Sequence, residues 1–117
     1  MAHPDVLIVG AGPAGSIAAL ILARAGVRVR IIDRARFPRE KLCGDTLNPG
    51  ALARLESLGL AKRVRAHALP VTGMIVTGPR GARIIGEYGG DLRGAAITRS
   101  VLDLLLLEAA KIGRAHV

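Results

Sequence analysis

Hydrophobic and polar positions over the first 33 residues follow the order of a strand, a turn, a helix and a second strand. Residues 5–9 read Asp-Val-Leu-Ile-Val without alternation, which predicts a strand buried on both faces, as in a parallel sheet. Residues 16–25 are rich in alanine and leucine, start just after a proline and stop at Gly26, so we expect a helix there. Residues 27–33 contain β-branched side chains and predict the second strand. Together these elements make one βαβ unit.

A loop and then a helix are predicted after the βαβ unit. Residues 34–47 are polar and irregular. Asn48 followed by Pro49 provides a capping side chain and a proline at the first helical position, which is a strong helix start. Leucines continue from there at helical spacing, and we expect the helix to end at Gly59.

The second half of the chain predicts a hairpin and a final helix. Residues 71–77 and 83–88 flank a Gly-Pro-Arg-Gly sequence and are typical of an antiparallel hairpin. We expect Ser100 to cap a helix over residues 101–111, whose leucines recur on one face. The chain is therefore predicted to be α/β, a Rossmann-like βαβ unit with an added helix and hairpin. Because only two parallel strands and a hairpin are available, one face of the sheet is expected to lie open.

The composition fits one small globular domain, since 50% of the 117 residues are hydrophobic and 22% are charged. The 17 basic and 9 acidic residues give a net charge of +8, a value also found in nucleic-acid-binding domains. However, the arginines are spread along the chain, and aromatic residues make up only 2%, so there is no platform on which bases could stack. We expect no nucleic-acid partner.

Membrane insertion, disulfide bonds and metal binding receive little support from the sequence. The longest apolar run, residues 17–23, is too short to span a membrane, so no integral membrane segment is expected and peripheral association is left open. Cys43 is the single cysteine, which excludes an internal disulfide and favours a cytoplasmic location. His3, His67 and His116 are scattered, and no metal site is expected.

The turn after the first strand carries the pattern Gly-x-Gly-x-x-Gly at Gly10, Gly12 and Gly15. In such turns the first glycine allows a sharp bend, the second lets a pyrophosphate approach the backbone, and the third lets the helix pack closely on the strand. The helix N-terminus, around Pro13 and Ala14, would present free N–H groups and a partial positive charge to that pyrophosphate. The pattern predicts a dinucleotide-binding site.

Asp33 lies at the end of the second predicted strand, 18 residues after Gly15. A carboxylate at this place accepts hydrogen bonds from a ribose diol. The motif alone leaves both FAD and NAD(P) open. Arg34 and Arg36 could hold a 2′-phosphate, but the neighbouring acid would repel that group, so NADP is the weaker candidate.

Two later segments carry a family resemblance. Residues 33–47 read Asp-Arg-Ala-Arg-Phe-Pro-Arg-Glu-Lys-Leu-Cys-Gly-Asp-Thr-Leu and lead into Asn-Pro-Gly-Ala-Leu and then Leu-Gly-Leu. Residues 91–103 end with an arginine, three residues and an aspartate at the start of a helix. With these motifs the chain resembles the geranylgeranyl reductase-like branch of the FAD-dependent oxidoreductases, within the superfamily of aromatic-ring hydroxylases and flavin-dependent halogenases. Asp33 departs from the glutamate that is more usual in that branch.

The resemblance implies FAD as the cofactor, with its ADP half on the glycine motif and Asp33. It also implies that Arg99 lies against the cofactor and that the loop of residues 41–45 passes near the flavin. Arg39 and Lys41 are left open between a cofactor contact and a solvated surface position. For Arg99 the alternative is a surface arginine before a helix cap, and for Cys43 it is a buried, inert thiol. The cofactor-binding residues predicted in this way are Gly10, Gly12, Pro13, Ala14, Gly15, Asp33, Arg34, Lys41, Cys43, Gly44 and Arg99.

By the same resemblance, the intact protein is an FAD-dependent oxidoreductase that takes electrons from a reduced donor, often NAD(P)H. It would then reduce a double bond of an isoprenoid substrate. Otherwise it would activate oxygen and use it to hydroxylate or halogenate a substrate, for example an aromatic one. No residue of this chain is predicted to be catalytic, because the flavin carries the reaction. Two alternatives stay open, an NAD(P)-dependent dehydrogenase domain and a nucleotide-binding module without catalysis; the oligomeric state is also open.

Members of the resembled branch are much longer than this chain, and have a later Gly-Asp motif and a substrate-binding sheet. We therefore expect residues 1–111 to be the N-terminal part of an FAD/NAD(P)-binding domain, incomplete and inactive by itself. Residues 112–117 read Ile-Gly-Arg-Ala-His-Val, which a common sequencing adapter encodes in one frame, so an artefact is expected there. The alternative is a genuine helix end with Gly113 as its cap.

Overall fold

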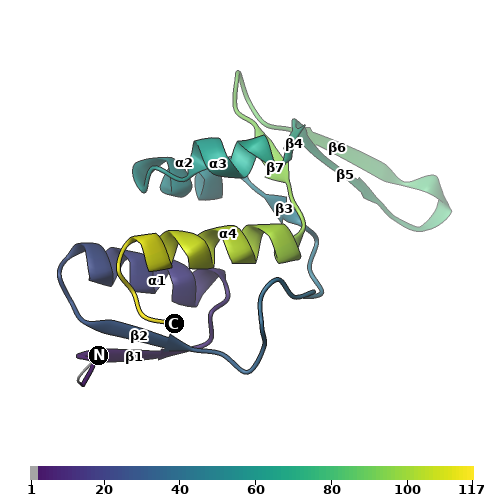
Figure 1. Ribbon diagram of the computed structural model, residues 1–117. Coiled ribbons are helices and arrows are strands. Elements are labelled where there is room, and N and C mark those ends of the chain that lie inside the picture. Colours follow the sequence, from purple (N-terminus) through teal and green to yellow (C-terminus); the bar gives the residue numbers. More distant parts are fainter. Residues whose placement is uncertain (1–2) are drawn as a thin grey trace. The chain divides into compact units, whose positions relative to one another are not determined.

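The computed structural model describes residues 3–117, which form two compact units. One unit contains residues 3–43 and 99–117, and the other contains residues 44–98. The chain leaves the first unit after Cys43 and returns to it at Arg99, as the colours of Figure 1 show.

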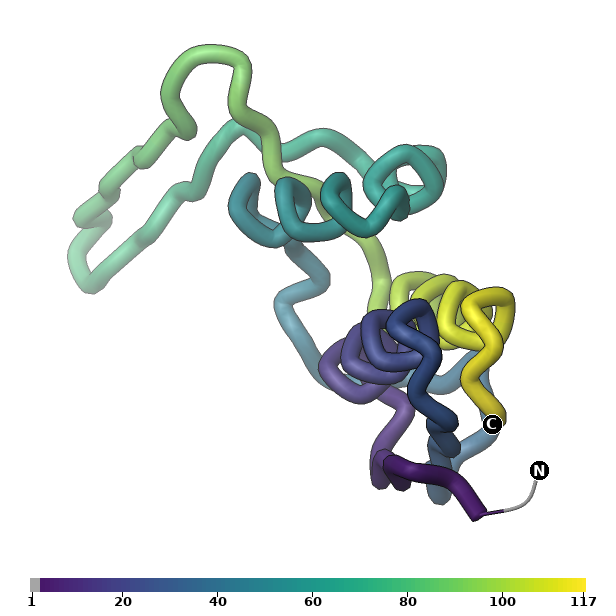
Figure 2. Tube along the Cα trace, turned by 90° about the vertical axis from the view of Figure 1, so that its left-hand side faces the viewer, coloured from purple at the N-terminus to yellow at the C-terminus, as the bar shows by residue number. Residues whose placement is uncertain are grey.

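The first unit is a βαβ unit with a second helix beside it. The strands β1 (Val6–Val9) and β2 (Val29–Ile32) pair in parallel along their whole length. The helix α1 (Pro13–Arg24) connects them, and α4 (Arg99–Ile112) packs beside α1 on the same side of the strands (Figures 1 and 2). The predicted order of strand, glycine-rich turn, helix and strand is confirmed.

Only one face of the β1–β2 pair is covered in this unit. Leu20 of α1 and Val29 and Ile31 of β2 are buried, as are four of the five leucines of α4. On the other face, Leu7 is 53% exposed and Val9 is 78% exposed. The prediction that the first strand is buried on both faces is therefore wrong for this chain, and the expected open face is present. Burial on both faces of a parallel pair needs a second layer, and both helices of this unit lie on one side.

The last helix begins earlier than predicted. Arg99 is already helical, so Ser100 is the second residue of α4 and not its cap. The side chain of Arg99 reaches Asp103 one turn later, at the i and i+4 spacing that brings side chains together on the surface of a helix.

After α4 the chain turns back onto β2. The backbone of His116 exchanges two hydrogen bonds with this strand, of 2.7 and 3.0 Å, in a parallel bridge. The left-handed residue that ends the helix is Arg114, with φ of 75°, and not the expected Gly113. A Cβ at Gly113 would lie 2.8 Å from Cδ1 of Leu20, so any other residue at this position requires the Leu20 side chain to move. The origin of residues 112–117 as an artefact stays a prediction.

The second unit contains a small antiparallel sheet. The strands β3 (Thr46–Leu47), β7 (Gly94–Ala96) and β4 (Leu69–Val71) lie in this order, with β7 in the middle. The sequence predicts none of these strands as separate elements: the predicted strand of residues 71–77 includes only the last residue of β4, and the predicted irregular segment of residues 34–47 is wrong at its last two positions. Strands of two or three residues are too short to show an alternating pattern, and this sheet joins segments far apart in the chain.

Two helices pack in the second unit, one predicted and one not. The helix α2 (Pro49–Ser57) starts as expected, with Oδ1 of Asn48 accepting a hydrogen bond of 2.8 Å from the N–H of Ala51. The helix α3 (Ala61–Ala66) follows at once and is missing from the sequence prediction. Its six residues give less than two helical turns, which is too short for a periodic signal.

The predicted hairpin is confirmed as β5 (Gly73–Thr77) and β6 (Arg83–Glu87), joined by a turn that contains the 3₁₀ helix Pro79–Gly81. Its apolar side chains are exposed on both faces of the ribbon, with exposed fractions from 57% to 70%; they are Met74, Ile75, Val76, Ile84 and Ile85.

Candidate functional site

Two glycines shape the turn between β1 and α1. Gly10 has a φ of 107°, which residues with a side chain rarely adopt, so the chain leaves the strand at a sharp angle. At Gly15 a Cβ would overlap the carbonyl oxygen of Gly10 and lie 3.2 Å from Cγ2 of Ile8. Only glycine at this position lets α1 pack so closely on the end of β1.

Gly12 has different surroundings. Its φ of −69° is open to any residue, and a Cβ there would meet nothing closer than Nη2 of Arg39 at 3.7 Å and Nη2 of Arg99 at 4.0 Å. Packing within the protein therefore does not require glycine here. The missing Cβ leaves space between the first turn of α1, whose N–H groups have no partner within the helix, and two guanidinium groups.

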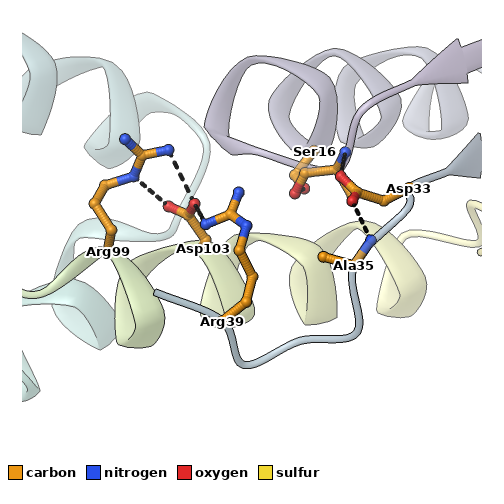
Figure 3. A network of polar contacts seen from close by, with 7 residues as sticks. Ser16, Asp33, Ala35, Arg39, Arg99 and Asp103 are labelled. Atoms are coloured by element: carbon orange, nitrogen blue, oxygen red, sulfur yellow. Dashed lines mark hydrogen bonds and ion pairs between the residues drawn. The ribbon is translucent and has the colours of Figure 1, made fainter. Parts of the chain in front are cut away.

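One buried carboxylate holds both arginines (Figure 3). Oδ2 of Asp103 accepts hydrogen bonds from Nη1 of Arg39 at 2.6 Å and from Nη2 of Arg99 at 3.0 Å, and Oδ1 accepts from Nε of Arg99 at 2.8 Å. The hydrogen bond to Asp103 raises the pKa of the Arg99 guanidinium, and a weaker hydrogen bond with Cys43 adds to this shift. Two positive charges and one negative charge leave the cluster with a net charge of +1 beside the N-terminus of α1.

Asp33 fixes the same turn from the end of β2. Its Oδ2 accepts from the N–H of Ala11 at 2.8 Å, and its Oδ1 accepts from the N–H of Ala35 at 2.8 Å (Figure 3). These two hydrogen bonds lower the pKa of the Asp33 carboxyl below its usual range, and the hydrogen bond from Ala11 has the larger effect. Ser16 is buried and donates from Oγ to the carbonyl of Ala11 at 3.0 Å. Each oxygen of Asp33 keeps a further lone pair, with which it can accept from a ribose hydroxyl.

Replacing Asp33 with asparagine is expected to lower the free energy of unfolding by about 1 kcal/mol at neutral pH. The amide can accept from only one of the two N–H groups and turns its own NH₂ toward the other. Because the pKa of Asp33 is lowered on folding, the unfolded chain binds more protons in acid. The stabilisation is complete above the ordinary carboxyl pKa of 3.8 and is lost as the pH falls through the lower folded value.

Denaturant unfolding of both proteins at pH 7 and at about pH 3 measures this effect. The difference in unfolding free energy between wild type and Asp33→Asn should become smaller at the acid pH. A difference that stays constant or grows in acid would contradict the role given to the two N–H groups.

A cavity of about 460 Å³ opens beside Asp33. Its walls include Ala11, Phe37 and Leu107 and are more apolar than polar. A flat heterocycle could lie between these walls, with an attached ribose at the carboxylate. The first unit thus offers an apolar cavity, a carboxylate and a positively charged turn in succession.

Most of the predicted site residues lie in this unit, but they do not all reach the turn. The glycine-rich turn with Pro13 and Ala14, Asp33 and Arg99 are brought together as described above. Arg34 and Lys41 are exposed. Cys43 is also exposed, so the alternative of a buried, inert thiol is wrong, but it is joined to the site through its hydrogen bond with Arg99. Gly44 belongs to the second unit and is not among the residues that the first unit assembles.

The sequence leaves the role of Arg39 undecided and indicates no role for Asp103. The spacing of Arg99 and Asp103 indicates that the two share one helix face. That Arg39, which is 64 residues from Asp103 in the chain, reaches the same carboxylate is visible only in the folded structure.

Other candidate features in residues 3–117 are few. No three His, Cys, Asp or Glu side chains of this range lie together as metal ligands would. None of its helices is long and apolar enough to cross a membrane. A second cavity, of about 310 Å³, lies in the second unit between Arg65, Pro70 and Arg93.

The sequence model of one protein family, described as FAD binding domain, matches residues 3–109. This range contains the glycine-rich turn, Asp33 and the arginine pair. The chain belongs to this family. It is an FAD-binding domain, and both the predicted cofactor FAD and the predicted α/β fold are confirmed.

Curated proteins and solved structures place this FAD-binding domain among larger flavoenzymes. A menaquinone reductase of Mycobacterium tuberculosis is 44% identical over 110 residues, which cover 85% of this chain and 24% of that protein. A kynurenine 3-monooxygenase of Salinispora arenicola is 40% identical over 104 residues, or 83% of this chain and 22% of that protein. The flavin-dependent brominase Bmp2 matches in structure with a TM-score of 0.85 and 26% identity, covering 97% of this chain and 28% of that one. The predicted superfamily of FAD-dependent oxidoreductases, hydroxylases and halogenases is confirmed, and the chain spans about a quarter of the length of these relatives.

Proposed function

We propose that the first unit of this domain holds the ADP half of FAD. The observation that carries this assignment is the space at Gly12, which no internal packing explains and which faces two guanidinium groups. A pyrophosphate has two negative charges and would fit between the first turn of α1, Arg39 and Arg99. The ribose hydroxyls would donate to Asp33, and the adenine would enter the apolar cavity beside it.

The remaining predicted residues would act around this core of the site. Gly10 and Gly15 shape the turn, and Pro13 and Ala14 form the first turn of α1. Arg34, Lys41, Cys43 and Gly44 belong to the stretch expected near the ribose and the flavin, and we keep them as candidates for contact with the cofactor.

For the intact protein we propose the reduction of a carbon–carbon double bond in an isoprenoid chain, with NAD(P)H as the electron donor. Support comes from the motifs in residues 33–60 and 91–103 and from the similarity to a menaquinone reductase, because menaquinone is a quinone with a polyprenyl chain. When bound, FAD would supply the transfer of an electron pair from the donor to the substrate. The residues of this domain would bind and orient the cofactor. A polyprenyl substrate dissolves in membranes, so the proposal includes peripheral contact of a cytoplasmic protein with a membrane.

A second candidate is oxygen-dependent hydroxylation or halogenation. Support for it comes from the similarity to a kynurenine 3-monooxygenase and from the structural match with a brominase. The two candidates share the FAD site and differ in what oxidises the reduced flavin.

The full-length protein tests both proposals. We expect it to purify with the visible absorbance of oxidised flavin and to lose that absorbance when NADH or NADPH is added without oxygen. Addition of a polyprenyl quinone should then restore the absorbance. The product should gain one pair of hydrogen atoms and keep them after exposure to air, because a reduced quinone ring reoxidises in air and a saturated chain does not.

The other outcomes decide against parts of this assignment. A colourless protein that also fails to bind added FAD would contradict the FAD site. A product that loses its extra hydrogens in air would indicate reduction of the quinone ring. Restoration of the flavin absorbance by oxygen alone, with an oxygen or halogen atom appearing in an aromatic substrate, would favour the second candidate.

A further inference from the structure

Asp103 is a fully buried charged residue, and its carboxylate forms ion pairs with two arginines, Arg39 and Arg99. The side chain is 1% exposed, whereas those of Arg39 and Arg99 each keep 18% exposure. Buried carboxylates are rare unless they are paired, because removing the charge from water is unfavourable. The arginines approach from different parts of the chain, Arg39 from the segment after β2 and Arg99 from the first turn of α4 (Figure 3).

The guanidinium groups are oriented by these contacts. Arg99 donates to Asp103 from both Nε and Nη2, which fixes the plane of its group. Arg39 donates from Nη1 and also lies over the ring of Phe37, 4.6 Å from its centre. With these contacts in place, the nitrogen atoms nearest to the missing Cβ of Gly12 are Nη2 of Arg39 and Nη2 of Arg99.

We propose that Asp103 is a positioning residue for the cofactor, and that it holds the guanidinium groups of Arg39 and Arg99 together at the first turn of α1 so that both face the pyrophosphate of FAD. The proposal rests on the FAD site proposed above and adds Arg39 to its residues. Without Asp103, two long and flexible side chains of like charge would repel each other at this place.

Removal of the Asp103 charge changes cofactor affinity in a direction that distinguishes positioning from simple electrostatics. The charge of Asp103 opposes that of a pyrophosphate, so by charge alone its removal would strengthen cofactor binding. If Asp103 positions the arginines, its removal weakens binding even though the site becomes more positive. The two explanations therefore predict opposite shifts of the dissociation constant.

The experiment uses the full-length protein freed of its cofactor, with FAD, ADP and adenosine as ligands. Asp103→Asn should weaken the binding of FAD and of ADP by about tenfold and leave that of adenosine, which has no phosphate, unchanged. Thermal unfolding of the same cofactor-free proteins reports whether the variant is folded. Asp5→Asn is the matched control, because it removes the carboxylate of an exposed ion pair with Arg28, whose atoms lie 2.6 Å apart. This pair lies at the opposite end of β1 from Gly10, so the control should bind all three ligands as wild type does.

A second comparison avoids leaving two uncompensated arginines. In a protein that already carries Arg39→Gln, addition of Asp103→Asn restores the wild-type net charge of the cluster and releases Arg99. Positioning predicts that this double variant binds ADP more weakly than Arg39→Gln alone, and charge predicts that it binds more tightly.

Each result has one meaning. Failure of the wild-type protein to bind FAD and ADP overturns the proposed FAD site itself. Normal binding by wild type, with equal or tighter binding by Asp103→Asn, overturns the positioning role alone. If Asp103→Asn does not fold, the decision rests on ADP binding by Arg39→Gln with and without Asp103→Asn, and tighter binding by the double variant overturns the proposal. Equal loss of ADP and adenosine binding would also count against the proposal.

Discussion

Replacement of Gly15 with alanine is expected to destabilise the FAD-binding domain by about 3 kcal/mol or more, which is a large fraction of the roughly 5–15 kcal/mol by which native proteins are stable. In the interior of a helix, alanine is normally more stable than glycine by about 1 kcal/mol, so the expected effect has the opposite sign to helix propensity. The Cβ would overlap the carbonyl oxygen of Gly10 and press on Ile8. The overlapped atom belongs to the backbone, so only a shift of α1 away from β1 relieves the overlap.

Denaturant unfolding and soluble yield of the full-length protein, freed of its cofactor so that differences in FAD binding do not contribute, measure this loss. Gly12→Ala is the matched control, since it is the same exchange three residues earlier and meets no atom closer than 3.7 Å. An unfolding midpoint of Gly15→Ala equal to or above that of wild type would show that α1 does not pack as closely on β1 as described here.

Gly12→Ala itself is expected to separate folding from cofactor binding. The backbone at Gly12 is in a conformation that alanine adopts easily, so the unfolding free energy of the cofactor-free protein should fall by less than about 1 kcal/mol, the loss typical of alanine at a helix N-cap. The new methyl group would occupy the space in front of Arg39 and Arg99. We expect FAD to bind about a hundredfold more weakly, which corresponds to about 2.7 kcal/mol.

Titration of the cofactor-free protein with FAD, ADP and adenosine checks this prediction. The affinities for FAD and ADP should fall together, and the affinity for adenosine should stay unchanged, because the methyl group blocks the pyrophosphate and not the adenine cavity. Unchanged FAD binding by a folded Gly12→Ala protein would remove the observation on which the proposed site rests.

Local signals account for the elements that the sequence predicted well. The βαβ unit is marked by two apolar runs, three glycines and a proline, and each acts through its own backbone or nearest neighbours. Asn48 and Pro49 mark the start of α2 for the same reason, and the Asn48 side chain does cap the helix. The hairpin follows from a turn sequence between two apolar segments.

The missed features depend on partners that are distant in the chain. Thr46 and Leu47 become a strand because they pair with Ala96 and Ala95, and neither segment has an alternating pattern of its own. The apolar run of β1 predicted two buried faces, but its hydrophobicity does not reveal which faces receive a covering layer. In this chain Leu7 and Val9 stay exposed.

The candidate site divides in the same way. The sequence by itself determined the glycine-rich turn and the acid at Asp33, because these depend on backbone conformation and on fixed spacing within one βαβ unit. The sequence also determined the FAD-binding family, but through the later motifs in residues 33–60 and 91–103. Only the tertiary structure decided that Arg39 and Arg99 share the carboxylate of Asp103 and that Gly12 faces both. The burial of the Asp103 carboxylate and its pairing with Arg39 depend on how segments 64 residues apart in the chain pack together.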